Sequence, residues 1–167
     1  SGSITGELTN AINGEGIENV TIDVRQGINV RSGSIVTSAT TNQNGQYQLN
    51  VDAGNYTAQA SHPDFNTTFF TLTSIGGQTQ VNINTSMSPR LAEGEIRIIL
   101  TWGDTPYDLD SHLTGPIPGN TTRFHVFYSD EGSRDSSPFT FLDHDDTQQF
   151  GPETITIVEQ FDGVYRY

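Results

Sequence analysis

Apolar and polar residues alternate along most of this chain, and no stretch of useful length shows the 3.6-residue period of a helix. In a β-strand, successive side chains point to opposite faces, so an alternating run predicts a strand with one buried face. The clearest runs lie at residues 20–24, 47–51, 56–60, 70–72 and 81–83. The chain is therefore predicted to be all-β, with polar outer faces.

Turn sequences separate these runs, at Asn13-Gly14, Asn44-Gly45, Gly54-Asn55 and Gly76-Gly77. About seven short strands within the first half of the chain are typical of a β-sandwich. The alternation then breaks at Pro89, which cannot donate a hydrogen bond inside a paired strand. We therefore predict two β-sandwich domains in tandem, at residues 1–88 and 91–167, of the immunoglobulin or transthyretin-like kind.

The second domain has its own alternating runs, at residues 96–102, 124–128, 139–141, 155–157 and 165–167. The last run places Tyr167, the final residue, inside an expected strand. A sandwich that stops there would be incomplete and would have an open edge. Two explanations stay open: the sequence is a fragment of a longer chain, or another copy supplies the missing strand, as in fibres built by strand donation.

Charge and composition exclude several classes of partner. The formal net charge is −13, with seven arginines and no lysine, so phosphate-rich nucleic acids and anionic membrane surfaces would be repelled. No apolar run is long enough for a membrane-spanning helix, and the lack of cysteine excludes disulfides and thiol chemistry. Ser, Thr, Asn and Gln make up 58 of the 167 residues, which favours a protein of the cell exterior.

Two acidic clusters are the strongest local signal of chemistry. Within each cluster, Asp108 and Asp110 point the same way if their segment is extended, as do Asp143 and Asp145. Such close carboxylates repel unless a cation neutralises them, and hard oxygen ligands suit Ca²⁺. We predict a calcium site in the loops between strands, since no EF-hand spacing is present; the alternative is two solvated acidic turns. The candidate ligands are Asp104, Asp108, Asp110, Asp143, Asp145 and Asp146.

Other candidate sites depend on exposed side chains. Tyr107 and Phe150 lie in the loops near the acidic clusters, where they could stack on a surface glycan or peptide ligand, or merely cover the loop. Five Asn-x-Ser/Thr sequences could carry N-linked sugar if the chain follows a secreted route in a glycosylating host. They are at Asn19, Asn55, Asn66, Asn84 and Asn120.

The first half contains a distinctive series of segments: Ile4-Thr5-Gly6, Ile12-Asn13-Gly14-Glu15-Gly16-Ile17, Thr41-Asn42-Gln43-Asn44-Gly45-Gln46-Tyr47-Gln48-Leu49 and Ala53-Gly54-Asn55-Tyr56-Thr57. In this order the segments resemble the carboxypeptidase regulatory-like domain, a transthyretin-like sandwich, over about residues 3–88. The resemblance implies an accessory, non-catalytic role, because such domains occur as spacers in many surface proteins.

The second half contains another distinctive series: Leu100-Thr101-Trp102-Gly103-Asp104, Pro106-Tyr107-Asp108-Leu109-Asp110-Ser111-His112-Leu113, Leu142-Asp143-His144-Asp145-Asp146 and Gly151-Pro152-Glu153-Thr154-Ile155. In this order the segments resemble a β-sandwich module of bacterial secreted and surface proteins, including calcium-dependent adhesins. Some of those adhesin relatives bind calcium and peptide ends, which adds weight to the calcium prediction.

Three functions are compatible with these observations. The first is a non-catalytic, calcium-stabilised module of a surface or adhesin-type protein, in which the first domain is a spacer and the second binds metal and ligand. The second is the subunit of an extracellular filament assembled by strand donation between copies. The third is a carbohydrate-binding accessory module or carbohydrate-active enzyme, although no glycosidase motif is present.

Overall fold

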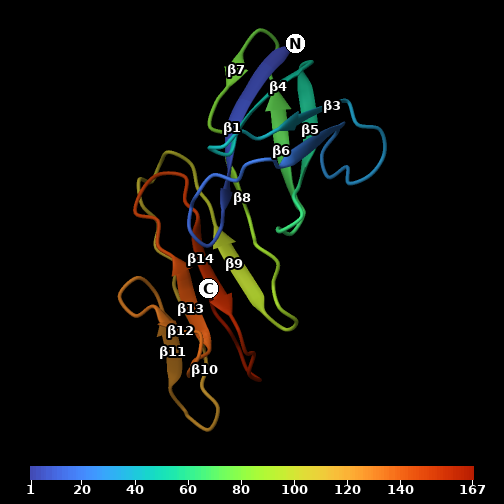
Figure 1. The fold of residues 1–167 in the computed structure, drawn as a ribbon. Coiled ribbons are helices and arrows are strands. Elements are labelled where there is room, and N and C mark those ends of the chain that lie inside the picture. Colours follow the sequence, from blue (N-terminus) through green and yellow to red (C-terminus); the bar gives the residue numbers. More distant parts are fainter. The chain divides into compact units, whose positions relative to one another are not determined.

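The computed structural model describes all 167 residues and is built from strands alone (Figure 1). Its contacts divide the chain into two compact units, one of residues 1–10 and 15–90 and one of residues 11–14 and 91–167. The prediction of an all-β chain with tandem sandwich domains is confirmed. No helix capable of crossing a membrane is present.

The first sheet of unit 1 is organised around its first strand. β1 (Gly2–Asn10) pairs antiparallel with β4 (Gln46–Val51), from Gly2 opposite Val51 to Glu7 opposite Gln46. On its other edge β1 runs parallel to β7 (Thr79–Gln80) and to β8 (Thr85–Met87). Residues 81–84 lie between these two short strands and connect them.

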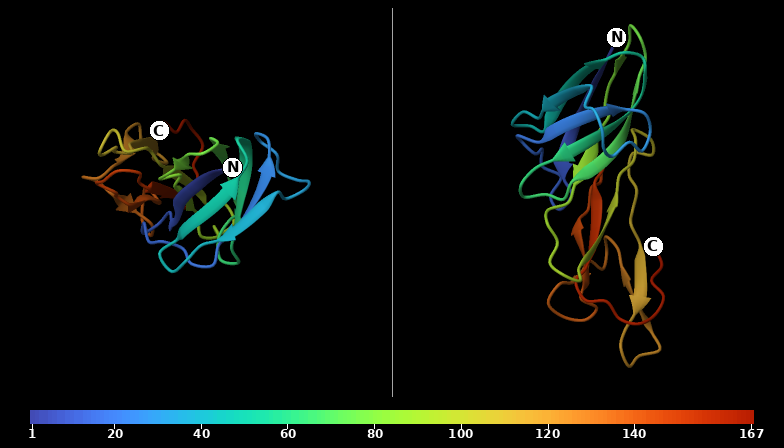
Figure 2. Two further views of the ribbon diagram at one scale, coloured as in Figure 1. Left: turned by 90° about the horizontal axis from the view of Figure 1, so that it is seen from above. Right: turned by 90° about the vertical axis from the view of Figure 1, so that its right-hand side faces the viewer.

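The second sheet of unit 1 is fully antiparallel. Its order is β3 (Thr37–Thr40), β2 (Thr21–Gln26), β5 (Gly54–Ser61) and β6 (Thr68–Ser74), as Figure 2 shows from two directions. Alternate side chains of both sheets point inward and bury a single apolar core, which makes this unit a sandwich. The core comprises Ile4, Leu8, Ile17, Val20, Ile22, Val24, Tyr47, Leu49, Val51, Tyr56, Ala58, Ala60, Leu72 and Met87.

Unit 2 has a four-stranded and a two-stranded antiparallel sheet. The larger has the order β12 (Gly132–Ser133), β13 (Thr140–His144), β14 (Glu153–Ile157) and β9 (Ile96–Leu100). The smaller pairs β10 (Leu113–Pro116) with β11 (Arg123–Val126). Both contribute to one core, made of Leu113, Phe124, Val126, Leu142, Ile155 and Ile157.

Two expected strands are not formed. At residues 81–83, Asn82 has a φ of 57°, in the left-handed region, so the backbone leaves the extended conformation and Val81 is 59% exposed. At residues 165–167, only Arg166 pairs with a strand: it forms an isolated bridge to Thr114, through hydrogen bonds of 2.8 and 2.9 Å. Tyr165 instead packs against the core of unit 2.

Candidate metal centre

Three carboxylates converge at one place in unit 2. Asp110 comes from the loop between β9 and β10, Asp145 from the loop between β13 and β14, and Glu153 begins β14. One carboxylate oxygen from each lies within 4.8 Å of the others. Asp110 and Asp145 are exposed, whereas Glu153 is fully buried, so the cluster has one open side and one side closed by the sheet.

Glu153 is the unusual member of this cluster. Its Oε1 accepts a 2.7 Å hydrogen bond from the backbone N–H of Ser111, but its Oε2 is buried with no hydrogen-bond partner. Burial raises the pKa of Glu153 to about 7; the Ser111 N–H opposes this, and the charges of Asp145 and Asp110 add to it. A buried polar atom without a partner costs about 1–3 kcal/mol, so this oxygen is a site where a bound cation would stabilise the fold.

Asp145 lies near several other negatively charged side chains. Its pKa is raised first by burial and then by the charges of Asp108, Asp110 and Glu131, while His144 lowers it. The charge of Asp108 therefore acts on Asp145, although Asp108 is not one of the three converging carboxylates. A divalent cation would reverse this effect, because it favours the ionised form of every carboxylate around it.

The spacing of the three oxygens fits a calcium ion. Ca²⁺ binds oxygen ligands at about 2.3–2.6 Å, so ligands on opposite sides of one ion lie about 4.6–5.2 Å apart. The three oxygens of Asp110, Asp145 and Glu153 all lie within 4.8 Å of one another, so they fit around one such ion. Backbone carbonyls and water would complete the six to eight ligands that calcium takes.

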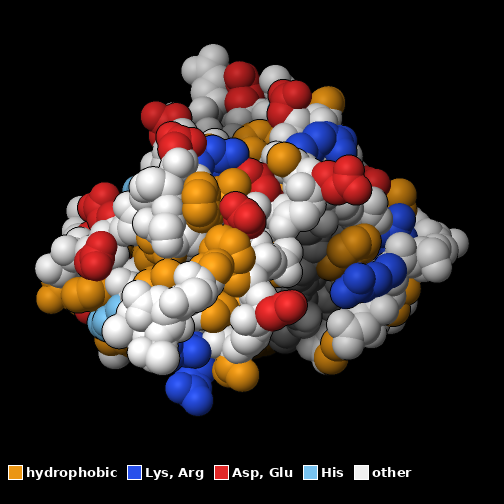
Figure 3. Space-filling view, turned by 90° about the horizontal axis from the view of Figure 1, so that it is seen from below, with side chains coloured by type: hydrophobic (Ala, Val, Ile, Leu, Met, Phe, Trp, Pro, Cys, Tyr) orange, Lys and Arg blue, Asp and Glu red, His pale blue; other side chains and the backbone are white.

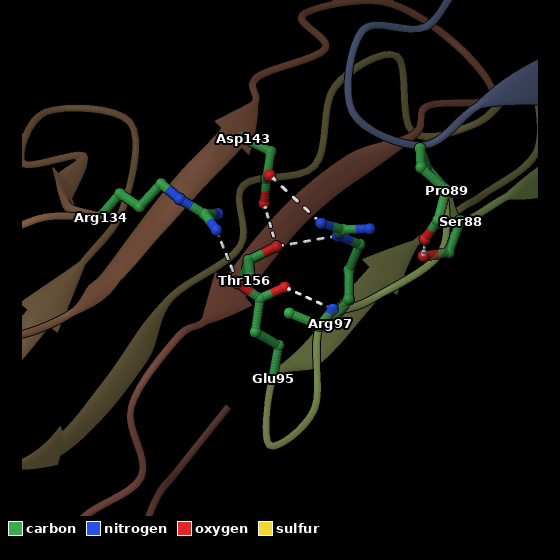
Figure 4. Close-up of polar contacts among 8 residues, drawn as sticks. Ser88, Pro89, Glu95, Arg97, Arg134, Asp143 and Thr156 are labelled. Atoms are coloured by element: carbon green, nitrogen blue, oxygen red, sulfur yellow. Dashed lines mark hydrogen bonds and ion pairs between the residues drawn. The ribbon is translucent and has the colours of Figure 1, made fainter. Parts of the chain in front are cut away.

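Asp143 lies in a different environment from its neighbour Asp145. Its Oδ2 accepts a 2.6 Å hydrogen bond from the Thr156 hydroxyl, and its Oδ1 is 3.9 Å from Nη2 of Arg97 (Figure 4). Arg97 Nε also donates to the Thr156 hydroxyl at 2.8 Å, and both charged side chains are less than a tenth exposed. Burial raises the pKa of Asp143, while Thr156 and Arg97 lower it. Asp143 on β13 therefore forms a buried ion pair with Arg97 on β9 and a hydrogen bond to Thr156 on β14.

A β-bulge at Asp143 explains why Asp143 and Asp145 lie in different environments. The register between β13 and β14 shifts between Leu142 and His144, so Asp143 occupies the bulged position. A bulge re-aims the side chains on either side of it. The expectation that Asp143 and Asp145 point the same way assumed an unbroken strand, and the bulge removes that assumption.

The other two predicted metal ligands lie outside the three-carboxylate group. Asp104 is exposed, and its backbone carbonyl accepts a 2.9 Å hydrogen bond from Nε2 of Gln149. Asp146 is half-buried, and its Oδ1 accepts a 2.9 Å hydrogen bond from the N–H of Gln148, which closes a local turn. Of the six predicted aspartate ligands, the structure therefore brings two together, Asp110 and Asp145, and the charge of a third, Asp108, acts on Asp145.

The predicted stacking residues flank the same loops. Tyr107 is 61% exposed, in the loop that carries Asp108 and Asp110. Phe150 is half-buried, and its backbone N–H and C=O bond to Gly103 and Trp102, which ties the two loops together. Ligand binding at Tyr107 and Phe150 stays a prediction.

The five possible glycosylation sites differ in access. Asn19, Asn55, Asn66 and Asn120 are exposed. Asn84 is half-buried, and its Oδ1 accepts a 3.0 Å hydrogen bond from the backbone N–H of Glu7. Modification at any of them stays a prediction.

Glu153 was not among the residues predicted from sequence, although the segment Gly151–Ile155 was recognised as distinctive. The sequence does contain a signal: Glu153 stands two positions before Ile155, in phase with the alternating run at 155–157. All five residues of β14 are buried, so this carboxylate needs a partner inside the fold. No spacing rule connects it to Asp110, 43 positions earlier in the chain.

On the face shown in Figure 3, acidic side chains lie among uncharged ones, and arginine side chains occur singly. No broad basic area is visible on that face.

The carboxypeptidase regulatory-like domain family model matches residues 3–88, which confirms the resemblance of the first half. The resemblance of the second half stays a prediction. None of the curated proteins matches this chain in sequence.

Solved structures show weak similarity. A DUF3823 family protein from Parabacteroides merdae has 12% identity and a TM-score of 0.41, over 67% of this chain and 53% of that one. A Streptococcal ancillary pilin has 14% identity and a TM-score of 0.43, over 95% of this chain and 59% of that one. The TIE protein of Bacillus anthracis has 13% identity and a TM-score of 0.40, over 95% and 31%. The chain thus spans less than two thirds of each of these structures.

Proposed function

Through residues 3–88 the chain belongs to the carboxypeptidase regulatory-like domain family. We propose that the chain is a non-catalytic module of a cell-surface protein and that Ca²⁺ stabilises it. The family is one of accessory rather than catalytic domains, and it covers nearly all of unit 1. The acidic, lysine-free, Thr- and Asn-rich composition supports an extracellular location. In this role unit 1 is a spacer and unit 2 binds the metal.

The calcium proposal is carried by the unpartnered, buried Oε2 of Glu153, in a group with the carboxylates of Asp110 and Asp145. A cation bound there would supply the missing partner and neutralise the repulsion among these groups. It would also join the β9–β10 loop and the β13–β14 loop to the first residue of β14. Because the ligands come together only in the folded chain, binding free energy becomes folding free energy.

The test is thermal unfolding in calcium-free buffer with EDTA and in excess CaCl₂, together with calorimetric titration of Ca²⁺. At a Ca²⁺ concentration of about 100 times Kd, the folded state gains about 2.7 kcal/mol, so the melting temperature rises by several degrees. Asp145→Asn and Glu153→Gln are expected to abolish most of this rise.

The matched control is Asp146→Asn, which removes one charge from the same loop. Its amide oxygen keeps the acceptor role toward Gln148, and Asp146 lies outside the carboxylate group, so Ca²⁺ affinity should be nearly unchanged. Equal melting temperatures in EDTA and in CaCl₂, with no calorimetric signal, would disprove the calcium centre.

A further inference from the structure

Unit 1 has a polar groove of about 460 Å³ beside the paired strands β1 and β4. Its walls come from the middle of β1, from β4 and its preceding turn, from the end of β3, and from the connection between β7 and β8. The residues lining it are Thr5, Gly6, Glu7, Thr40, Asn42, Gln46, Tyr47, Gln48, Asn82 and Asn84. This volume is within the range of small-ligand sites, about 300–1,000 Å³.

Three amide side chains in this groove are each fixed at one end and unused at the other. Oδ1 of Asn84 accepts from the N–H of Glu7 at 3.0 Å, which leaves its amide N–H₂ unused. Oε1 of Gln46 accepts from Asn42 at 3.1 Å, which again leaves an N–H₂. Nε2 of Gln48 donates to the Ser3 hydroxyl at 3.2 Å, which leaves a carbonyl oxygen. Side chains anchored in this way lose little entropy when they bind a ligand.

Glu7 adds a charged acceptor to the groove. Its backbone N–H is bonded to Asn84, whereas its half-buried carboxylate makes no ion pair or hydrogen bond of its own. Burial raises the pKa of Glu7, which shows that the carboxylate is partly withdrawn from water without compensation. A ligand that donates hydrogen bonds would compensate it.

The lining selects the class of ligand. Every side chain except the buried Tyr47 is neutral and polar or, at Glu7, acidic, so an apolar ligand would find no complementary surface. No arginine lines the groove, and Glu7 would repel an anion. The groove therefore offers both hydrogen-bond donors and hydrogen-bond acceptors. This set matches a compound with many hydroxyl groups, because each hydroxyl both donates and accepts.

We propose that this groove binds a carbohydrate, with hydroxyl groups donating to Glu7 and Gln48 and accepting from Gln46 and Asn84. The inference rests on the proposed role as a non-catalytic surface module and is independent of calcium. It places the ligand on unit 1, whereas Tyr107 and Phe150 belong to unit 2. Sugar attached to Asn84 itself would fill the same groove, so the proposal takes Asn84 as unmodified.

The experiment is NMR titration of the ¹⁵N-labelled full chain, made in a host without N-glycosylation. The probes are cellobiose, maltose, lactose, chitobiose and its deacetylated form, each at up to about 50 mM, where even millimolar affinities are visible. We expect at least one saccharide to shift the amide signals around Glu7, Gln46, Gln48 and Asn84.

Glu7→Gln and Gln48→Ala should each weaken that binding by about tenfold or more, the loss of one well-placed hydrogen bond to the ligand. Gln43→Ala is the control, because Gln43 is exposed in the turn next to the groove but does not line it, so its affinity should be unchanged. All variants should keep their melting temperature and their response to Ca²⁺, which separates failure of this site from failure of the calcium centre.

Three results would overturn the proposal. One is the absence of shifts with every saccharide; another is shifts that map outside the groove. The third is saccharide binding that survives both Glu7→Gln and Gln48→Ala.

Discussion

The carboxylate of Glu153 accepts a hydrogen bond from the backbone N–H of Ser111 at 2.7 Å, across 42 residues of sequence. This bond holds the end of the β9–β10 loop against the start of β14. The Ser111 hydroxyl in turn bonds to the hydroxyl of Tyr167 at 2.8 Å, so Ser111 links the buried Glu153 to the exposed Tyr167. Its second oxygen remains free to bind a cation.

The first prediction concerns pH in the absence of metal. Burial raises the pKa of Glu153 to about 7 from 4.5, so between these values the folded chain holds a proton that the unfolded chain has released. The stability contributed by this group is therefore full below pH 4.5 and is lost as the pH rises through about 7. Melting temperatures in EDTA should fall over that range.

The control for this pH effect is Glu153→Gln, which cannot titrate and should have a flatter profile. Excess Ca²⁺ should restore stability at pH 7 and above, where the carboxylates are ionised. A wild-type profile in EDTA that rises between pH 5 and 7.5, and that Glu153→Gln does not alter, would contradict the prediction.

The second prediction separates the buried ion pair from the metal centre. Asp143→Ala leaves Arg97 without its buried counter-charge and Thr156 without its acceptor, and should cost about 3–5 kcal/mol. Because Asp143 lies apart from the carboxylate group, the loss should be the same in EDTA and in CaCl₂. Chemical denaturation in both buffers measures it.

Asp135→Ala is the comparison for that variant, since Asp135 is an exposed acidic residue of the same unit and only its backbone N–H is bonded. It should change stability by no more than about 0.5 kcal/mol. If the Asp143→Ala loss appeared only in CaCl₂, Asp143 would be a calcium ligand after all.

The strands of unit 1 could be predicted from the sequence because each carries its own alternating pattern. Val20-Thr21-Ile22-Asp23-Val24 predicts a strand, and β2 covers residues 21–26 with Ile22 and Val24 buried. The pattern fails at Val81 and Ile83, where a single left-handed residue, Asn82, breaks the extended backbone. A short alternating run indicates which residues are apolar, but it does not determine the backbone angles of the polar residue between them.

The group of three carboxylates could be predicted only in part. Local clustering identified Asp110 and Asp145, but the third member of the group, Glu153, is brought to them by pairing of β14 with β9 and β13. The bulge that removes Asp143 from the group is equally a property of the paired sheet. Such long-range relations have no trace in residue spacing. Assembly by strand donation stays a prediction that electron microscopy of native material would test.

The third prediction concerns a buried hydroxyl in the family-matched unit. Thr41 is 3% exposed; its Oγ1 donates to the carbonyl of Ile17 at 2.6 Å and accepts from the N–H of Val20 at 2.9 Å. Thr41→Val keeps the shape but leaves two backbone groups unpaired, and should cost about 1–3 kcal/mol. Thr21→Val on the exposed face of β2 should be within about 0.5 kcal/mol of wild type. Equal stabilities for the two variants would show that the Thr41 bridge contributes nothing.

The last prediction compares two glycines with the same backbone angle. Gly45 and Gly77 have φ values of 76° and 74°, where a side chain is disfavoured by about 1–2 kcal/mol. A Cβ at Gly77 would meet nothing within 4 Å, whereas at Gly45 it would overlap the carbonyl oxygen of Leu8 and lie 2.8 Å from Cα of Gly16.

Gly77→Ala should therefore lose only the conformational cost, about 1–2 kcal/mol. Gly45→Ala must in addition push apart two backbone segments, one of which bonds Leu8 N–H to the carbonyl of Gly45 itself at 2.9 Å. Its loss in a denaturant titration should be at least about twice that of Gly77→Ala, or the protein should fail to fold. Losses of equal size would mean that glycine is needed at position 45 only because of its positive φ. The backbone of β1 near Leu8 would then move away from the added Cβ without a measurable cost.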